Sequence, residues 1–288
     1  MAQIAERWSR RGVTATVGLF ALLLGLGQIL DISQPLQWAA IGGALGLVGT
    51  AAGGALSLSV QRIRPEVEDG MLGFAAGMML AAAAFSLVLP GIELGAQAWS
   101  SSLTAALMVA IGLGLGAVAM TALDRMLPHE HAQLGRQGGA DARMDRVWLF
   151  VMAMAIHNLP EGMAVGVGFA GQGLEGGWSL ALAIAIQDVP EGLAVALALR
   201  AAGVSSPTAA LIAAGSGVFE PLGAALGFVF ASALGAAMPV AMGFAAGAML
   251  FIVSHEVIPE THRRGHQAAA TRGLMAGFAL MMILDNAL

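Results

Sequence analysis

Long apolar runs separated by short polar segments set the pattern of this chain. Each run has about 18–28 mostly apolar residues, the length that an α-helix needs to cross ~30 Å of hydrocarbon. The pattern therefore predicts an all-α integral membrane protein with nine spanning helices. They lie at residues 13–31, 37–60, 69–90, 102–124, 146–170, 177–199, 207–233, 238–258 and 270–288.

Composition supports this class. Hydrophobic residues make up 58% of the 288 positions and charged residues only 11%, whereas a soluble domain carries about 25% charged residues. The net charge of −5 says little about partners, because the charges belong to loops or buried sites. We expect the lipid bilayer as a partner and no nucleic acid. Cysteine is absent, which excludes disulfides and thiolate metal ligands.

The first run has two interpretations. Three arginines precede residues 13–31, as in a signal peptide. The apolar core is long for such a peptide, and no small-residue cleavage site follows it. An uncleaved helix is therefore favoured. The predicted organisation is a cytoplasmic stub with an extra helix at 1–36, followed by an eight-helix domain at 37–288.

The positive charges predict the orientation. With nine spans, every arginine of this lysine-free chain lies on one side, which by the positive-inside rule is the cytoplasm. The N-terminus is then cytoplasmic, the C-terminus lies outside, and residues 125–146 form a cytoplasmic loop. The arginines are Arg7, Arg10, Arg11, Arg62, Arg64, Arg125, Arg136, Arg143, Arg146, Arg200, Arg263, Arg264 and Arg272.

An internal repeat is visible. Residues 73–80 and 243–250 agree at seven of eight positions. The predicted topology gives these two spans opposite directions, so the similarity indicates an inverted repeat, which is common in secondary transporters. The alternative is that Gly-xxx-Gly spacing merely lets helices pack closely in lipid.

Two related segments place acids inside apolar runs. Residues 157–162 read His-Asn-Leu-Pro-Glu-Gly and residues 187–192 read Gln-Asp-Val-Pro-Glu-Gly. In each, the glutamate (Glu161 or Glu191) follows the first residue by four positions and shares its helix face. A carboxylate at the centre of a spanning helix costs roughly 2.5–3.5 kcal/mol. A bound cation is the natural compensation.

The prolines of these segments predict local breaks. Pro160 and Pro190 cannot donate hydrogen bonds to the carbonyls of Ile156 and Ile186, so each helix is expected to kink. The freed carbonyl oxygens would then be buried in protein or line a wet cavity.

Potential metal ligands gather at one depth. Imidazole with carboxylates suits Zn²⁺, Fe²⁺ or Mn²⁺, and the lack of thiolate argues against copper(I). Four carboxylates exceed what one tetrahedral ion needs, so two ions bridged by Glu161 and Glu191 are predicted as substrate, with no prosthetic group. The candidate ligands are Met79, His157, Asn158, Glu161, Gln187, Asp188, Glu191 and Glu220.

Simpler interpretations exist for these residues. The Pro-Glu-Gly segments can be helix kinks with protonated, hydrogen-bonded glutamates. Asn158 and Gln187 can join helices by hydrogen bonds, and Met79 can be a packing residue. The coincidence of Glu220 with the two segments at one depth favours the metal site.

Two further groups suggest a path. Histidines and acids toward the cytoplasm form a candidate exit, although such loop residues are usually only solvated. At the outer end, Ser86 and Glu93 are candidate entrance residues, and Asp285 is either an entrance residue or close to the outer surface. The exit group is Asp124, His129, His131, His255, Glu256, His262 and His266.

The two segments together resemble the paired motif of the ZIP (Zrt/Irt-like) metal transporters, over about residues 37–288. The resemblance implies eight core helices, arranged as two inverted three-helix repeats around a central pair, and usually a homodimer. It also implies a two-metal centre and import of Zn²⁺, Fe²⁺, Mn²⁺ or Cd²⁺ into the cytoplasm. The extra helix at 13–31 departs from the family pattern.

The resemblance also implies how the ligands divide. One site would consist of Met79, His157, Glu161, Gln187 and Glu191. The other would consist of Asn158, Asp188, Glu220 and the two shared glutamates.

The mechanism expected from these features is alternating access in a bacterial inner membrane, with one repeat moving against the other. A gated metal channel with the same site is an alternative. A second is an intramembrane metal-dependent hydrolase, since His255-Glu256 begins like a His-Glu-x-x-His motif. Proline at 259 and the missing second histidine argue against it.

Overall fold

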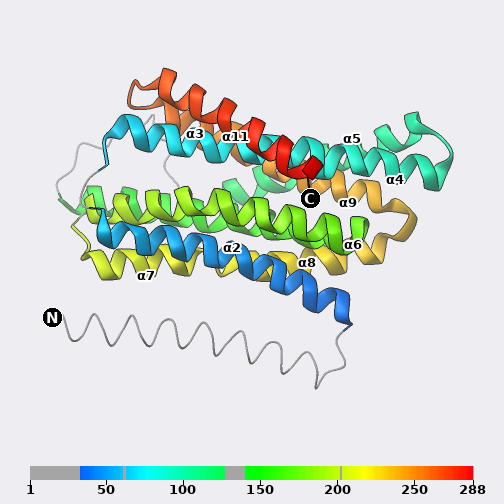
Figure 1. Cartoon of the computed structure of the whole chain (residues 1–288), viewed down its shortest axis with the longest axis horizontal. Coiled ribbons are helices and arrows are strands. Elements are labelled where there is room, and N and C mark those ends of the chain that lie inside the picture. The colour runs from blue at the N-terminus through cyan, green and yellow to red at the C-terminus, as the bar shows by residue number, and fades with distance from the viewer. Residues whose placement is uncertain (1–32, 61–62, 127–139, 202, 288) are drawn as a thin grey trace.

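The computed structural model describes residues 33–60, 63–126, 140–201 and 203–287. The run predicted at 13–31 and most of the loop predicted at 125–146 lie outside these residues. Within the described ranges all regular structure is helical (Figure 1). The all-α class predicted from the sequence is therefore confirmed for this part of the chain.

The helices follow the apolar runs closely. Six stretches of the described chain are long and apolar enough to cross a membrane, as expected for an integral membrane protein. The elements are α2 (Gln34–Ser59), α3 (Pro65–Ala81), η1 (Ala82–Val88), α4 (Leu89–Trp99), α5 (Ser102–Met126), α6 (Ala140–Ala201), α7 (Ser206–Ser216), α8 (Phe219–Leu234), η2 (Gly235–Ala237), α9 (Met238–Ile252), η3 (Val253–Val257), α10 (Ile258–His262) and α11 (Gln267–Ala287).

The long element α6 consists of two helices that meet at Gly173. This residue has φ 73° and ψ −157°, a backbone conformation that glycine adopts without steric cost. The runs predicted at 146–170 and 177–199 correspond to the two halves. Gly173 alone joins the two halves, without an intervening loop.

The kinks predicted at Pro160 and Pro190 stay a prediction, because a proline can bend a helix axis while the backbone around it remains helical. Both prolines lie inside α6, whose non-helical backbone is at Gly173. The irregular geometry appears elsewhere, in the π-helical segments η1 and η3. Pro90 and Pro259 follow these segments two residues after their ends. Because proline donates no backbone hydrogen bond, both places suit a change from α to π geometry.

The repeat at 73–80 and 243–250 packs in two equivalent ways. A Cβ atom added at Gly73 would lie 2.2 Å from the carbonyl oxygen of Ala270 in α11. One added at Gly243 would lie 2.2 Å from that of Val109 in α5. In each copy of the repeat, glycine therefore lets the backbone contact another helix. The similarity of the two segments is thus compatible both with close helix packing in lipid and with a repeated architecture.

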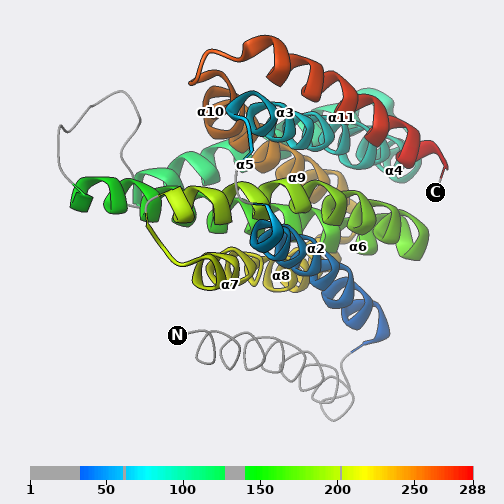
Figure 2. The same ribbon diagram turned by 60° about the vertical axis from the view of Figure 1, so that its left-hand side comes forward.

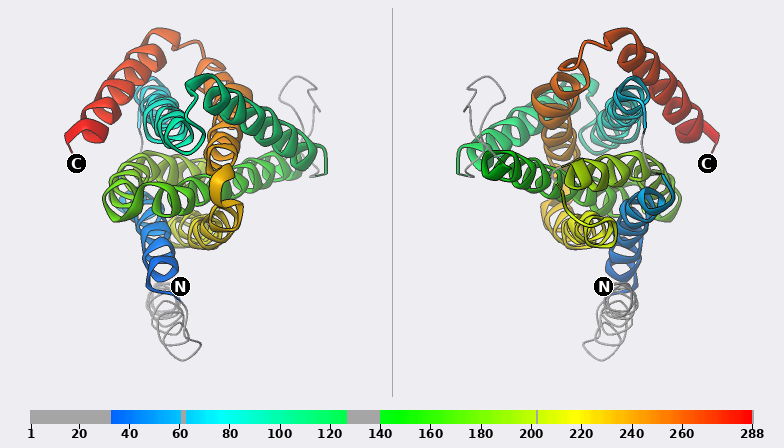
Figure 3. Two further views of the ribbon diagram at one scale, coloured as in Figure 1. Left: turned by 90° about the vertical axis from the view of Figure 1, so that its right-hand side faces the viewer. Right: turned by 90° about the vertical axis from the view of Figure 1, so that its left-hand side faces the viewer.

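The helices form two groups around α6. Helices α2, α7 and α8 pack on one side of it, and α3, α5, α9 and α11 lie on the other (Figures 1 and 2). The views along the long axis show α6 between the two groups (Figure 3). Because α3 pairs with α11 and α5 with α9, the two predicted repeats are interleaved and do not form separate bodies.

Substitution at a glycine contact tests this packing. In Gly77→Ala the new Cβ would lie 2.0 Å from the carbonyl oxygen of Leu274, so α3 and α11 have to separate. We expect a loss of stability of about 1–3 kcal/mol, measured as a lower midpoint of thermal unfolding in detergent. Gly114→Ala, at an exposed position with no atom within 4 Å, is the control. Equal midpoints for the two variants would contradict the packing.

Candidate metal centre

The two halves of α6 and the start of α8 bring the predicted ligands together. The first half of α6 supplies His157, Asn158 and Glu161, and its second half supplies the 187–192 segment. Helix α8 supplies Glu220 in its first turn. All seven side chains are buried, between 0% and 4% exposed. They are His157, Asn158, Glu161, Gln187, Asp188, Glu191 and Glu220.

Three carboxylates converge on one point. Oxygen atoms of Glu161, Asp188 and Glu191 lie within 4.8 Å of one another. Three negative groups at this separation repel strongly in a low-dielectric interior. A cation among them would convert this repulsion into attraction, so the arrangement has the donor set and spacing of a metal site.

The hydrogen bonding of these acids is incomplete. Gln187 Nε2 donates to Glu161 Oε1 at 2.6 Å, which leaves Glu161 Oε2 and Gln187 Oε1 without a partner. Both oxygens of Asp188 and one of Glu191 are also unpartnered. Buried polar atoms are normally paired, so these oxygens fit a bound metal ion. The hydrogen bond from Gln187 joins the two halves of α6, as one interpretation predicts, and a ligand role for its Oε1 stays a prediction.

Glu220 closes the centre from the α8 side. Its Oε1 accepts a hydrogen bond of 3.1 Å from Thr50 Oγ1 in α2, while its Oε2 has no hydrogen-bond partner. Gly162 follows Glu161, and a Cβ there would lie 2.0 Å from the carbonyl oxygen of Glu220. The glycine of the first Pro-Glu-Gly segment therefore allows α8 to approach the ligands.

Met79 has a different environment. It is 1% exposed in α3 and belongs to the main apolar cluster. This agrees with a packing role, and its role as a ligand stays a prediction.

Among the residues of the predicted exit group that the structure describes, Glu256 approaches the centre. Glu256 Oε2, in η3, lies 3.7 Å from His157 Nε2. The ring of His255 stacks on Phe251 with centroids 4.9 Å apart. His129 and His131 lie outside the described residues, and the side chain of Asp124 is not described either.

The last two histidines of that group face other partners. His262 Nδ1 lies 2.9 Å from the carbonyl oxygen of Ile258 in its own helix. His266 Nδ1 lies 2.8 Å from Asp69 Oδ2, at the start of α3. Both contacts join or stabilise helix ends, and neither involves a carboxylate of the candidate centre.

The predicted entrance residues lie partly together. Ser86 Oγ donates to Asp285 Oδ1 at 2.5 Å, linking η1 to the end of α11, whereas Glu93 is exposed on α4. Gln172 Nε2, beside the turn of α6, donates to the carbonyl oxygen of Ser86. Pro90 lacks the N–H that an α-helix would direct at this carbonyl, so the side chain of Gln172 takes its place.

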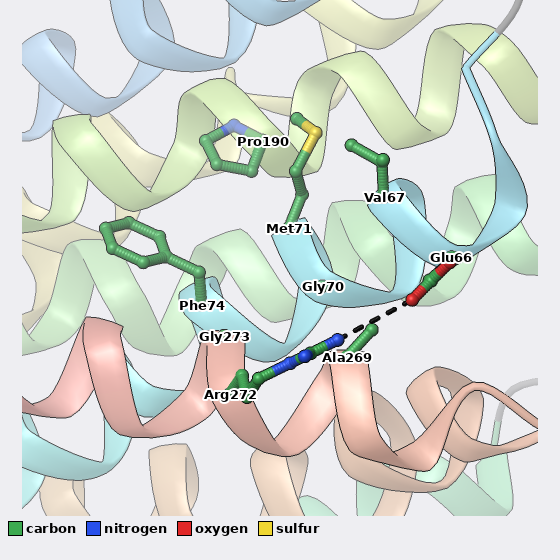
Figure 4. Close-up of a pocket in the computed structure, with 9 residues that line it drawn as sticks. All are labelled: Glu66, Val67, Gly70, Met71, Phe74, Pro190, Ala269, Arg272 and Gly273. Atoms are coloured by element: carbon green, nitrogen blue, oxygen red, sulfur yellow. Dashed lines mark ion pairs between the residues drawn. The ribbon is translucent and has the colours of Figure 1, made fainter.

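A pocket of about 570 Å³ lies apart from the ligands, between α3, α11 and Pro190 of α6 (Figure 4). Figure 4 shows Pro190 and Met71 facing each other across it. Its charged residues, Glu66 and Arg272, are exposed and 3.6 Å apart. An ion pair in solvent contributes little energy, and none of the buried carboxylates lines this pocket. It is therefore not part of the metal centre.

Sequence reasoning missed Thr50 and Gln172. A single threonine in a glycine-rich helix carries no pattern that predicts a contact with a residue 170 positions away. Gln172 lies in a short segment between two spans and has no motif of its own. Their roles depend on tertiary contacts alone.

The fold and site together define a class: a multi-pass membrane protein with a buried, carboxylate-rich cluster between its helices that could hold a metal ion. A family model described as "ZIP Zinc transporter" matches residues 125–285, more than half of the chain. The chain belongs to the ZIP family.

Named relatives agree with this assignment. The chain is 57% identical over 281 residues to "Zinc transporter ZIPB" of Bordetella bronchiseptica, covering 96% of this chain and 91% of that protein. It is 44% identical over 244 residues to "Zinc transporter GufA" of Myxococcus xanthus, covering 84% and 96%. It is 33% identical over 247 residues to "Zinc transporter ZupT" of Corynebacterium aurimucosum, covering 82% and 91%.

Neutralising a central carboxylate tests the centre directly. Glu161→Gln keeps the shape of the side chain and removes its charge, so we expect the affinity for Zn²⁺ to fall at least tenfold. Isothermal titration of the purified protein in detergent measures this. Glu175→Gln, at an exposed position near the turn of α6, should bind as the wild type does. Unaltered affinity in Glu161→Gln would show that zinc binds elsewhere.

Proposed function

We propose that this protein imports divalent transition-metal ions, with Zn²⁺ as the main substrate, into the cytoplasm through the buried centre. The observation that carries the proposal is the convergence of Glu161, Asp188 and Glu191 within 4.8 Å. The names of the relatives favour zinc. Imidazole suits Fe²⁺ and carboxylates suit Mn²⁺, and we propose both ions, together with Cd²⁺, as competing substrates.

The centre is proposed to hold two ions. Glu161 and Glu191 would bridge them, since their side chains come from the two halves of α6. His157, Gln187 and Met79 would complete one site, and Asn158, Asp188 and Glu220 the other. Each proposed site has buried oxygens without a hydrogen-bond donor, which supports this division. They belong to Gln187 in the first site and to Asp188 and Glu220 in the second.

The proposed topology has eight passes in the described chain and a ninth at 13–31. The apolar stretch His157–Ala201 turns back at Gly173, and the stretch Ser206–His262 turns back at η2. With all arginines on the cytoplasmic side, the N-terminus is inside and the C-terminus outside a bacterial inner membrane. Lipid and a second copy of the chain would cover exposed apolar residues such as Leu103 and Met275.

The path is proposed to run from Ser86, Glu93 and Asp285 to the centre, and from there past Glu256 toward the cytoplasm. Glu256 supports this direction because it approaches His157, a residue of the centre, to 3.7 Å. A carboxylate at that place can accept a cation as it leaves the imidazole. The remaining residues of the predicted exit group would act further along the loop side.

Alternating access is the proposed mechanism, and the packing of the helices indicates which of them move together. The interleaving of the repeats argues against the motion of one whole repeat past the other. We propose instead that α6 carries the metal together with α2 and α8, against α3, α5, α9 and α11. A negative-inside potential favours entry of a divalent cation by roughly 4.6 kcal/mol per 100 mV, so no coupled ion is required.

Two other functions are distinguishable from this one. A channel with the same centre would conduct at rates far above those of a carrier and would not saturate at low metal concentration. A hydrolase would need a second histidine after His255-Glu256. His255 instead stacks on Phe251, which gives that alternative no support.

Uptake into proteoliposomes tests the function. We expect saturable ⁶⁵Zn influx through the wild type, stimulated by a negative-inside potential, because the substrate carries two positive charges. His157→Ala should reduce influx at least tenfold, since it removes the imidazole of the centre. Unchanged influx in His157→Ala would contradict the proposed path.

Controls and selectivity use the same assay. Glu175→Gln should transport like the wild type, because its side chain is exposed and remote from the buried ligands. Addition of unlabelled Fe²⁺, Mn²⁺ or Cd²⁺ should lower ⁶⁵Zn influx in proportion to the affinity of each ion. Influx that does not saturate would favour the channel.

A further inference from the structure

The side chain of Thr50, in α2, is hydrogen-bonded to Glu220 of the candidate metal centre. Its side chain is 3% exposed, and Oγ1 lies 3.1 Å from Glu220 Oε1. The same hydroxyl lies 3.3 Å from the carbonyl oxygen of Gly46, one turn earlier. A hydroxyl has one proton to donate, and the shorter contact, to a carboxylate, makes the stronger hydrogen bond.

The backbone of Thr50 is fixed by the second Pro-Glu-Gly segment. A Cβ atom at Gly192 would lie 2.1 Å from the carbonyl oxygen of Thr50. The first segment shows the same relation, since a Cβ at Gly162 would lie 2.0 Å from that of Glu220. Each segment therefore packs its glycine against one of two residues whose side chains meet across the centre.

Gly46 leaves space for the carboxylate that Thr50 binds. A Cβ atom at Gly46 would lie 1.3 Å from Glu220 Oε2 and 2.8 Å from Asp188 Oδ2. These two oxygens thus border the same small volume. Both are buried, and no backbone, amide or hydroxyl donor reaches them, so the two carboxyl groups face each other.

We propose that Thr50 is a positioning residue for the second metal ion. By holding Glu220 Oε1, the hydroxyl turns Oε2 toward Asp188, and this pair of oxygens binds the cation. The inference rests on the proposed two-ion centre and adds α2 to the helices that build it. Loss of an outer hydrogen-bond partner of a metal ligand typically lowers metal affinity 10–100-fold.

The test compares Thr50→Val with Thr50→Ser in the purified full-length protein. Valine preserves the shape of threonine and removes the hydroxyl, whereas serine keeps it. Titration with Zn²⁺ should give two binding events for the wild type. In Thr50→Val the weaker event should shift by about 10–100-fold and the tighter one should not change. Thr50→Ser should restore both.

A second variant displaces Glu220 from the opposite side. In Gly46→Ala the new methyl group meets the flexible end of Glu220, which can move without disturbing the helix backbone. As in Thr50→Val, we expect the weaker binding event to shift to lower affinity and the tighter one to stay unchanged. Gly215→Ala, in α7 with no atom within 4 Å, is the matched control and should bind two ions.

The outcomes separate the two proposals. Two unchanged binding events in both Thr50→Val and Gly46→Ala would overturn the positioning role and leave the transport function standing. Equal weakening of both events without rescue by Thr50→Ser would also overturn it, because a general structural defect predicts that result. A wild type that binds no zinc would refute the proposed function itself.

Discussion

Mutual repulsion among buried carboxylates is the constraint on which this structure depends. Glu161, Asp188 and Glu191 lie together with oxygens that no neighbour satisfies. In the described part of the chain, arginines pair with acids at helix ends, such as Glu68 and Glu260, and not with these three. The centre can therefore be stable with charged ligands only when a cation is present, and this dependence is what a metal carrier requires.

Close approach of backbones makes that centre possible. The acids of three different helices can meet only if the helix axes are near each other, and glycine permits this by removing the side chain at the contact. Gly162 and Gly192 do so within the two Pro-Glu-Gly segments themselves. The sequence Pro-Glu-Gly thus combines a candidate ligand with the glycine that lets the neighbouring helix approach it.

Much of the helical arrangement was predictable because hydrophobic length is a strong signal in a membrane. The run predicted at 37–60 corresponds to α2, and the run at 102–124 to α5. Glu161 and Glu191 were identifiable because an acid in an apolar run has few explanations. The turn at Gly173 and the contact of Thr50 with Glu220 were not predictable, since both depend on how helices meet in space.

The π-helical segment η1 has a consequence for the rod formed by α3 and α4. In an uninterrupted α-helix, Gly91 would lie within about 40° of the face that carries Gly77. A π turn takes up one additional residue, which rotates everything beyond it by about 100°. Accordingly Gly77 faces Leu274 of α11, whereas Gly91 faces Val109 of α5 and Met242 of α9. One continuous rod thus presents its small residues to different neighbours along its length, and the phase change between them is encoded by a single extra residue.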